Sequence, residues 1–375
     1  MTIHIDTLDD LNKHIPLKQK LVSIHQVVRQ SLPFIARIAV TLYDPKTRVL
    51  KTFLHSSDGE NPLPHYQVPL EDAPSLKKIL EEKNPRIINN MLTFDDGSRE
   101  HDRRLGRSGY AASYTMPIFN DGDFLGFLFF NSMRADVFDD RALAQVDVFG
   151  HLISLMLIKE LSTIRTLTAA LKTASKITHL RDPETGSHLD RMSRYSRMIA
   201  TALADKYRLE DDYIEHVFMF SPLHDIGKIG IPDEVLMKKG SLSEEEKRLM
   251  RTHAMKGREI IDEILREFGL DGFDYVDILR NITEFHHESV DGSGYPAGMK
   301  GEDIPLEARI VAVADVFDAL TSKRCYKQAW SNDEAFDLLA QLAGEKLDAD
   351  CVKALLDNRE EVEKIQAYFR ENSYG

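Results

Sequence analysis

Histidine and acidic side chains gather at three places in the C-terminal half of this 375-residue chain. The motif HDIGK occupies residues 224–228, the motif HHESVDGSGYP occupies residues 286–296, and Asp315 lies inside an apolar run. Imidazoles and carboxylates spaced in this way can build a site that holds more than one metal ion. A carboxylate can bridge two cations, whereas a neutral imidazole usually binds one. Together these motifs indicate metal-assisted hydrolysis.

Two further segments supply candidate ligands, although each has a plainer explanation. Glu184 and His188 are four residues apart, and a helix that begins with Asp182 as its N-cap and Pro183 as its first residue places both on one face. A first-turn glutamate and a solvated histidine would show the same spacing. His253 lies in a helix rich in charge, where a lone histidine is usually an exposed surface residue.

Asp315 and Asp318 lie one helical turn apart in the apolar run 309–320. A buried acid is unfavourable unless it is paired or binds a metal, so Asp315 is a candidate ligand. The alternative for Asp315 is a buried salt bridge to Arg309 or Lys323. Asp318 is expected either to contact substrate or to hold a ligand histidine in place.

His286 and His287 are adjacent, and adjacent side chains on a helix diverge by about 100°. Both can therefore reach one metal cluster only if the cluster lies at the end of the helix. Otherwise one is a core histidine and the other a surface histidine. The glycines that precede Tyr295 allow a close backbone approach, and the alternative is a plain structural turn.

Basic and aromatic side chains near these motifs are candidates for substrate contacts. The ammonium of Lys228 could meet a phosphate held by the metals, and Tyr295 could stack on a base or hydrogen-bond to a phosphate. Arg324 and Lys327 could clamp a phosphate or a guanine, unless they form a solvated basic pair. Asp225 and Lys228 are the candidate catalytic residues.

The composition is that of a globular protein, with 42% hydrophobic and 29% charged residues and a net charge of -13. The acidic balance argues against a general nucleic-acid surface. Cys325 and Cys351 do not make a disulfide framework, and fourteen histidines favour nitrogen and oxygen metal ligands. The N-terminus lacks the apolar core of a signal peptide, and we find no apolar run that approaches the roughly 18 residues of a membrane span. We therefore expect a cytoplasmic protein without a membrane segment.

The N-terminal part alternates helical and strand signals. Residues 21–32 have helical spacing, which Pro33 ends. The motif NDGD at residues 120–123 is a strong hairpin signal. Strands rich in β-branched and apolar residues are predicted at 35–43, 48–55, 112–119 and 124–132. These elements would form a compact α+β unit.

A long helix is predicted from about Asp139 to Leu180, with Gly150 as its only glycine. A heptad seam can be traced through Leu157, Leu161, Ile164, Thr168, Leu171 and Ser175. The helix either packs on its neighbours as a connector between domains or forms a parallel dimer seam that carries a signal. After Asp182 no alternating strand run is found, and helices are predicted at 211–220, 244–268 and 331–356.

These patterns resemble two known families. Residues 1–145 resemble a GAF domain, a small-ligand sensor or dimerisation module, in their order of helices, strands and hairpin. Residues 181–356 resemble the HD-GYP domain of bacterial cyclic di-GMP phosphodiesterases through HDIGK, His253, HHESVDGSGYP and Asp315. The resemblance implies a two-domain chain with an α+β sensor domain at 1–145, a connecting helix at 146–180 and an all-α HD-GYP domain at 181–375.

The HD-GYP resemblance also implies a set of site residues. It implies two or three divalent ions, iron or manganese, with Asp225 bridging two of them and Glu184 associated with a third. The implied ligands are Glu184, His188, His224, Asp225, His253, His286, His287 and Asp315. The matching substrate-contact positions are Lys228, Asp318, Arg324 and Lys327. The chain departs from the family at Lys239, Ala254 and Cys325, where prolines are usual, and none of these is a ligand.

The implied activity is hydrolysis of cyclic di-GMP to the linear dinucleotide and onward to GMP. Metal-bound water would attack phosphorus while the cations and Lys228 neutralise charge on the phosphoryl oxygens. The GAF-like part would regulate this activity in a homodimer, and its ligand is unknown because the cyclic-nucleotide signature of some GAF domains is absent. The alternatives are an adaptor that binds a diguanylate cyclase through the Gly-Tyr-Pro loop, and a hydrolase of another cyclic dinucleotide.

Overall fold

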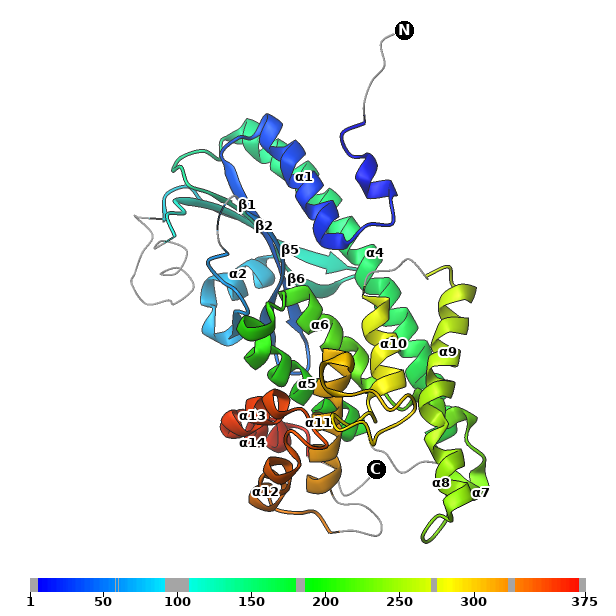
Figure 1. Cartoon of the computed structure of the whole chain (residues 1–375). Coiled ribbons are helices and arrows are strands. Elements are labelled where there is room, and N and C mark those ends of the chain that lie inside the picture. Colours follow the sequence, from blue (N-terminus) through cyan, green and yellow to red (C-terminus); the bar gives the residue numbers. More distant parts are fainter. Residues whose placement is uncertain are drawn as a thin grey trace. The chain divides into compact units, whose positions relative to one another are not determined.

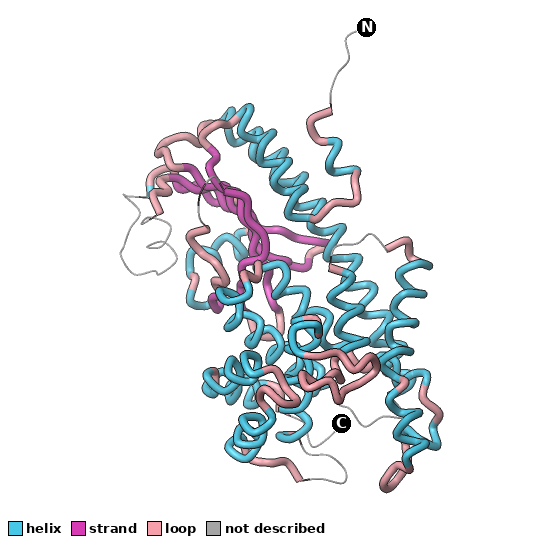
Figure 2. Tube along the Cα trace, in the orientation of Figure 1, coloured by secondary structure: helices cyan, strands magenta, loops and turns pink. Residues whose placement is uncertain are grey.

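The computed structural model describes residues 6–57, 59, 61–91, 108–179, 186–270, 275–322 and 328–370 of the chain. The chain forms two compact units, Met1–Ile164 and Arg165–Gly375 (Figure 1). In the described residues the strands belong to the first unit, and the second is built from helices and loops (Figure 2). Of the predicted site residues, Glu184, Arg324 and Lys327 lie outside the described part of the chain.

The first unit is built on an antiparallel sheet with the strand order β3-β2-β1-β6-β5-β4. Helix α1 and the first half of α4 pack on one face of this sheet, and α2 packs on the other with Leu76 and Ile79. The strands are β1 (Ile35–Asp44), β2 (Val49–Ser57), β3 (Gln67–Pro69), β4 (Arg86–Ile88), β5 (Ala112–Asn120) and β6 (Asp123–Ser132). The helices are α1 (Leu17–Ser31), α2 (Pro74–Glu82) and α4 (Asp140–His179), with short 3-10 turns at Asp9–Asn12 and Leu70–Asp72.

The predicted α+β pattern of the first unit is confirmed. The four predicted strands differ from β1, β2, β5 and β6 by no more than about two residues at either end. The predicted hairpin joins β5 to β6, with Asp121 and Gly122 at positive φ as a two-residue hairpin turn requires. Strands β3 and β4 and helix α2 were not predicted, because three-residue edge strands are too short to show an alternating pattern.

The long helix is confirmed as α4, Asp140–His179. Leu157 and Leu161, two positions of the proposed dimer seam, are buried in the core of the first unit. These two side chains therefore pack within their own chain, as the connector interpretation expects. The segment Asp140–Leu171 is also long and apolar enough, by length and composition alone, to cross a membrane. The expectation that no apolar run approaches a membrane span is therefore wrong for this helix, although a core helix meets the same criterion.

The second unit is helical throughout its described residues, apart from one isolated bridge between Ala343 and Leu347. The predicted helix 211–220 is confirmed as α6. The helices are α5 (Gly186–Tyr207), α6 (Asp211–Phe220), α7 (Asp233–Leu236), α8 (Glu244–Arg251), α9 (His253–Glu267), α10 (Val276–Phe285), α11 (Leu306–Thr321), α12 (Asn332–Leu342), α13 (Ala349–Asp357) and α14 (Arg359–Tyr368). Three 3-10 turns join them, η4 (Ser221–Leu223), η5 (Ile226–Gly230) and η6 (Gly301–Asp303).

Two predicted helices of the second unit are each broken in two. The predicted helix 331–356 ends at Leu342 and resumes at Ala349, because Gly344 adopts a φ of +81° in the turn between them. The predicted helix 244–268 breaks at Thr252, whose hydroxyl donates to the carbonyl of Leu249 at 2.6 Å. The second break places the first residue of α9, His253, at the metal centre described below.

Gly257 does not interrupt α9 and instead allows it to pack closely on the η5 turn. A Cβ added to Gly227 would lie 1.8 Å from the carbonyl oxygen of His253 and 2.4 Å from the amide nitrogen of Gly257. A side chain at residue 227 would thus push α9 away from the HDIGK turn. The two glycines bring the backbones that carry Asp225 and His253 together.

Candidate metal centre

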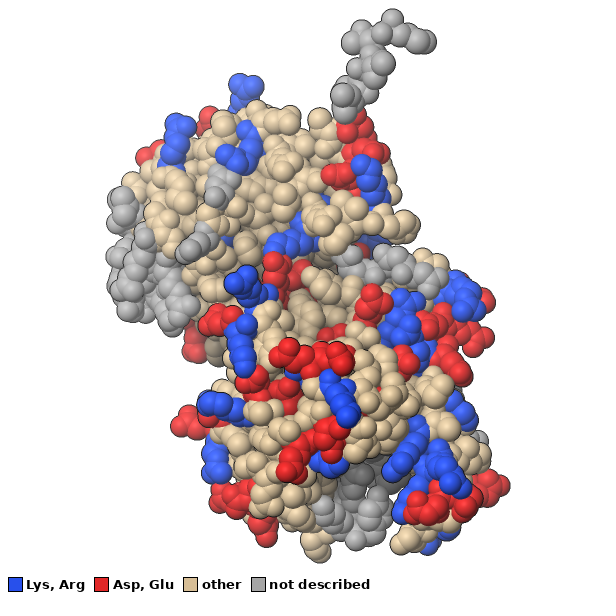
Figure 3. Space-filling model, viewed as in Figure 1, with Lys and Arg blue, Asp and Glu red and all other residues tan. Residues whose placement is uncertain are grey.

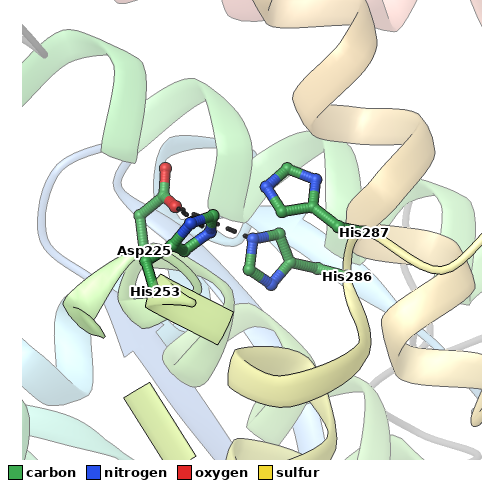
Figure 4. A group of neighbouring side chains, drawn as sticks. All are labelled: Asp225, His253, His286 and His287. Carbon is green, nitrogen blue, oxygen red and sulfur yellow. Dashed lines mark ion pairs between the residues drawn. The ribbon is translucent and has the colours of Figure 1, made fainter. Parts of the chain in front are cut away.

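Seven side chains of the second unit converge as two adjacent groups of potential metal ligands. Asp225, His253, His286 and His287 form the first group, and their ligand atoms lie within 4.8 Å of one another. Figure 4 shows this group, with the carboxylate of Asp225 and the three rings turned toward one another. The second group, which obeys the same distance limit, is His188, His224 and Asp315. Seven of the eight predicted ligands are thus brought together, and the eighth, Glu184, lies outside the described residues.

These ligands come from five separate stretches of the chain. His188 is on α5 and Asp315 is on α11, while His224 and Asp225 lie between the η4 and η5 turns. His253 begins α9, and His286 and His287 follow the end of α10 with ring centroids 4.1 Å apart. The helix end lets both of these adjacent histidines face one centre, as predicted.

Asp225 faces both groups with its two carboxylate oxygens. Its Oδ1 lies 3.1 Å from His253 Nε2 and 3.7 Å from His286 Nε2. Its Oδ2 lies 3.2 Å from His224 Nε2 and 2.8 Å from the Lys228 ammonium. His224 Nε2 is in turn 3.9 Å from Asp315 Oδ1. This arrangement is the one expected of a carboxylate that bridges two cations.

Three ligand histidines are held by backbone carbonyls in one tautomer. The Nδ1 atoms of His224, His253 and His286 lie 2.9, 2.8 and 2.8 Å from the carbonyl oxygens of Ser221, Met250 and Ile282, respectively. A carbonyl oxygen can only accept, so each Nδ1 carries the proton and donates it. The Nε2 lone pairs are therefore available to a metal ion, as in most protein metal sites.

Several buried atoms of the first group lack a hydrogen-bond partner. Among the described residues these include Asp225 Oδ1, His253 Nε2 and His286 Nε2. Unsatisfied polar atoms in a protein interior are unfavourable and call for an explanation. These three acceptor atoms converge on one region, and they belong to residue types that bind divalent cations. Their arrangement is therefore suited to a metal ion.

The electrostatics of the centre favour the protonation states that a metal needs. Burial acts to raise the pKa of Asp225, but Lys228, His224 and His253 outweigh it and hold that pKa well below its usual range. Burial lowers the pKa of His286, and burial together with His286 lowers that of His287 further. At neutral pH the carboxylate is ionised and these two imidazoles are neutral, as metal ligation requires.

Asp318 holds a ligand in place and does not reach a substrate. It is fully buried, and its Oδ2 accepts a hydrogen bond from Nδ1 of His188 at 2.7 Å. Arg191 donates to both carboxylate oxygens, from Nε at 2.6 Å and from Nη2 at 2.9 Å. Burial acts to raise the pKa of Asp318, but His188 and Arg191 lower it to about 2. The prediction of Asp318 as a substrate contact is therefore wrong, and the alternative, that it orients a histidine ligand, fits.

Arg191 is a functional residue that sequence reasoning missed. Besides Asp318, its Nη1 donates to the carbonyl of Phe369 at 3.0 Å, just beyond α14, and its Nη2 donates to Ser322 at 2.7 Å. The side chain thereby ties the C-terminal end of the described chain to the carboxylate that orients His188. Arg191 lies three residues after His188, about one helical turn along α5. This spacing was the sequence signal that could have indicated a role beside that ligand.

The turn after the histidine pair is held by Glu288, which sequence reasoning did not assign. Its carboxylate accepts hydrogen bonds from the backbone amides of Ala297, Gly298 and Met299 at 2.6, 3.0 and 3.0 Å. The turn places the Tyr295 ring 4.8 Å from that of His287, and the Tyr295 amide donates to the His287 carbonyl at 3.2 Å. The loop is thus part of the wall of the metal centre.

The plainer alternative fails for His253, and one of the two proposed salt-bridge partners of Asp315 is excluded. His253 is buried, with 2% exposure, so it is not a surface histidine. Arg309, the proposed salt-bridge partner of Asp315, instead pairs with Asp348 at 2.7 Å. Lys323, the other proposed partner, lies outside the described residues.

The two units match two family models. Residues 19–157 match the model of the GAF domain, and residues 172–351 match a model of the HD domain. The match of the second unit includes every ligand of both groups.

Curated relatives match the second half of the chain. A protein of Vibrio cholerae named "Probable cyclic di-GMP phosphodiesterase" is 41% identical over 196 residues, which cover 51% of this chain and 44% of the relative. "Cyclic di-GMP phosphodiesterase response regulator RpfG" of Xanthomonas campestris is 44% identical over 189 residues, 50% of this chain and 47% of the relative. A "3'3'-cGAMP-specific phosphodiesterase 2" of Vibrio cholerae is 37% identical over 187 residues, covering 50% of this chain and 34% of the relative. The chain thus spans less than half the length of these relatives.

Proposed function

We propose that this chain, in which a GAF domain is joined to an HD domain, is a metal-dependent phosphodiesterase that hydrolyses cyclic di-GMP to the linear dinucleotide and GMP. The observation that carries the proposal is the carboxylate of Asp225, whose two oxygens face two adjacent groups of histidine ligands. Relatives that are 41% and 44% identical over this half of the chain carry that activity in their names.

Two divalent ions would be held by the two ligand groups, with Asp225 shared between them. When bound, such ions lower the pKa of a coordinated water and neutralise charge on a phosphoryl group. The ligand set of imidazole nitrogens and carboxylate oxygens suits iron or manganese. A third ion would require Glu184.

The protein side chains around the ligands bind and orient the substrate. Lys228 is 18% exposed, and its ammonium lies 2.8 Å from Asp225 Oδ2, so a phosphoryl oxygen placed beside the ligand groups can accept a hydrogen bond from it. Burial raises the pKa of Tyr295, so its hydroxyl stays protonated and can donate to a phosphate or a base edge. Both groups would favour an anionic substrate.

The surface argues for local rather than general recognition of a phosphate ligand. On the face drawn in Figure 3, basic and acidic side chains are interspersed over the described residues. With a net charge of -13, attraction of a dianionic dinucleotide therefore depends on the metal centre and the few cations beside it.

The adaptor alternative is not favoured, because the Gly-Tyr-Pro loop is tied into the metal centre. Tyr295 packs on His287, and Glu288 holds the backbone that follows it. A second substrate class has more support, since three of the curated relatives are named for 3'3'-cGAMP. Regulation by the GAF domain, a homodimer and a cytoplasmic location are further proposals, and none is needed for the chemistry.

Elemental analysis combined with turnover of a dinucleotide panel tests the proposal. The purified protein, loaded with iron or manganese, is incubated with cyclic di-GMP, 3'3'-cGAMP and cyclic di-AMP, and the products are separated by chromatography. We expect about two metal ions per chain and fastest turnover of cyclic di-GMP. Metal-loaded protein that leaves all three dinucleotides intact would overturn the proposed activity, and faster turnover of 3'3'-cGAMP would replace the substrate.

A further inference from the structure

We propose that Arg251 is an additional substrate-positioning residue, a guanidinium held against Tyr295 so that it contacts a phosphate oxygen of the ligand at the metal centre. This inference deepens the proposed function and rests on it for the identity of the ligand. None of the sequence motifs includes Arg251, and the structure brings it to the site.

Arg251 lies at the junction of α8 and α9, next to a ligand of the first group. Arg251 is the last residue of α8, and the ligand His253 is the first residue of α9. In one continuous helix, side chains two positions apart point about 200° away from each other, so only one of them could face the metals. At this junction His253 turns its ring toward Asp225, and the long side chain of Arg251 reaches Tyr295.

Tyr295 forms the platform that orients the guanidinium. The Arg251 guanidinium carbon lies 5.3 Å from the centroid of the Tyr295 ring, within the range of a cation–π contact. The same ring lies 4.8 Å from the His287 ring and 6.3 Å from the His253 ring. Arg251 is therefore one aromatic ring away from two ligands of the first group.

The charge of Arg251 is not used in an ion pair, unlike the charges of its neighbours. Lys247 and Arg248 on the same helix pair with Glu244 at 2.8 Å and with Glu245 at 3.0 Å. Within the described part of the chain, no carboxylate lies within ion-pair distance of Arg251, and its side chain is exposed. An exposed arginine that is pre-oriented by an aromatic ring loses little entropy when its planar fork meets a phosphate.

The position of Arg251 complements that of Lys228. Lys228 lies at the Asp225 carboxylate, beside both ligand groups, whereas Arg251 contacts Tyr295, whose ring lies next to those of His253 and His287. We assign Arg251 to an oxygen of the phosphate group that the metal centre would hold, contacted from the side of Tyr295, which makes it a determinant of binding more than of bond cleavage.

The test compares Arg251→Gln and Arg251→Lys with the control Arg248→Gln, which removes an ion-paired arginine one turn away on the same helix. All proteins are loaded with the same metal, and metal content is checked. Steady-state kinetics with cyclic di-GMP give kcat and KM, and isothermal titration with inorganic phosphate gives an affinity that does not depend on turnover. A role limited to holding the loop would change kcat and metal content together with KM.

For Arg251→Gln we expect KM to rise about tenfold and phosphate to bind several-fold more weakly, with kcat within about threefold of the wild type and metal content unchanged. Arg251→Lys should recover part of the phosphate affinity, and Arg248→Gln should match the wild type. If Arg251→Gln matches Arg248→Gln in both KM and phosphate affinity, the inference is overturned. If the wild type does not hydrolyse cyclic di-GMP, the proposed activity fails instead, and the phosphate titration still decides the role of Arg251.

Discussion

A buried histidine of the first unit and the buried histidines of the metal centre differ in how their ring nitrogens are used. His25 on α1 is 3% exposed, and both nitrogens have partners, with Nδ1 2.8 Å from the Ser56 hydroxyl and Nε2 3.0 Å from the Ile35 carbonyl. His253 and His286 are each 2% exposed, and in each only Nδ1 has a hydrogen-bond partner.

The comparison shows that burial alone does not identify a ligand. A histidine with two satisfied nitrogens stabilises the fold, because it fills space and completes hydrogen bonds in the interior. A histidine whose second nitrogen points at other acceptors is unfavourable until a cation binds there. The first unit therefore gains stability from His25, whereas the second unit keeps a locally unfavourable cluster for function.

Replacement of Asp225 by alanine is expected to have the largest effect. The variant lacks the oxygens that face both ligand groups, so hydrolysis of cyclic di-GMP should fall by at least about a thousandfold. The helical fold should be retained, because Lys228, the cation that loses its carboxylate partner, is 18% exposed and can turn toward water. Turnover, metal content and circular dichroism check these outcomes. An Asp225→Ala protein with near wild-type turnover would contradict a bridging role.

Matched alanine variants of His253 and His25 test the comparison directly. His25→Ala should lower the free energy of unfolding of the first unit by about 2–4 kcal/mol, because it leaves a cavity and unpaired buried groups. His253→Ala should instead lower metal content and turnover while the metal-free protein unfolds much as the wild type does. Urea unfolding of the metal-free proteins and elemental analysis separate the two effects. The reverse pattern, with metal lost in His25→Ala, would break the comparison.

Removal of Arg191 should show an intermediate effect. In Arg191→Met the carboxylate of Asp318 loses its guanidinium partner, and His188 loses a fixed orientation. Metal affinity should fall by roughly tenfold to a hundredfold, the range typical of residues that orient a metal ligand. The control Arg194→Met changes an arginine of the same helix whose guanidinium packs 4.0 Å from the Phe369 ring. Metal titrations of both variants give the comparison, and equal affinities would argue against a positioning role for Arg191.

The smallest expected effect is the pH dependence caused by His216, a buried histidine of the second unit outside the metal centre. Its Nδ1 donates to the Asp212 carbonyl at 2.6 Å, and burial lowers its pKa to about 4. The unfolded chain, with an ordinary histidine pKa of about 6.5, binds more protons than the folded chain between pH 6.5 and 4. Stability from this group is therefore present above about pH 6.5 and is lost as the pH falls.

The expected loss from His216 is about 2 kcal/mol between pH 7 and pH 5. Urea unfolding of the metal-free protein at both pH values measures it, and His216→Phe should remove this part of the difference. The same pH dependence in wild type and variant would show that His216 does not carry it.

Much of the site could be predicted because short sequence motifs contain many of its candidate ligands. HDIGK and HHESVDGSGYP each place ligands next to glycines that allow close packing, as the contact of Gly227 with α9 shows. Helix breaks were harder to predict, since Thr252 has no strong breaking tendency and its backbone stays in the right-handed helical region between α8 and α9. The role of Asp318 depended on which partner, His188 or a substrate, lay nearby after folding.

Residue types and local spacing were sufficient for the kind of chemistry, for the α+β and helical halves and for a list of candidate ligands. The resemblance to the HD-GYP domain implied the ligand set, of which the structure brings seven together. These features depend on interactions within a few residues, which a sequence displays directly. Other features could be read only from the tertiary structure. They are the division of the ligands into two groups, the way the two oxygens of Asp225 face both groups, and the roles of Arg191, Glu288 and Arg251. These properties arise from contacts between residues far apart in the chain, whose distances are set by helix packing and by the positions at which helices end.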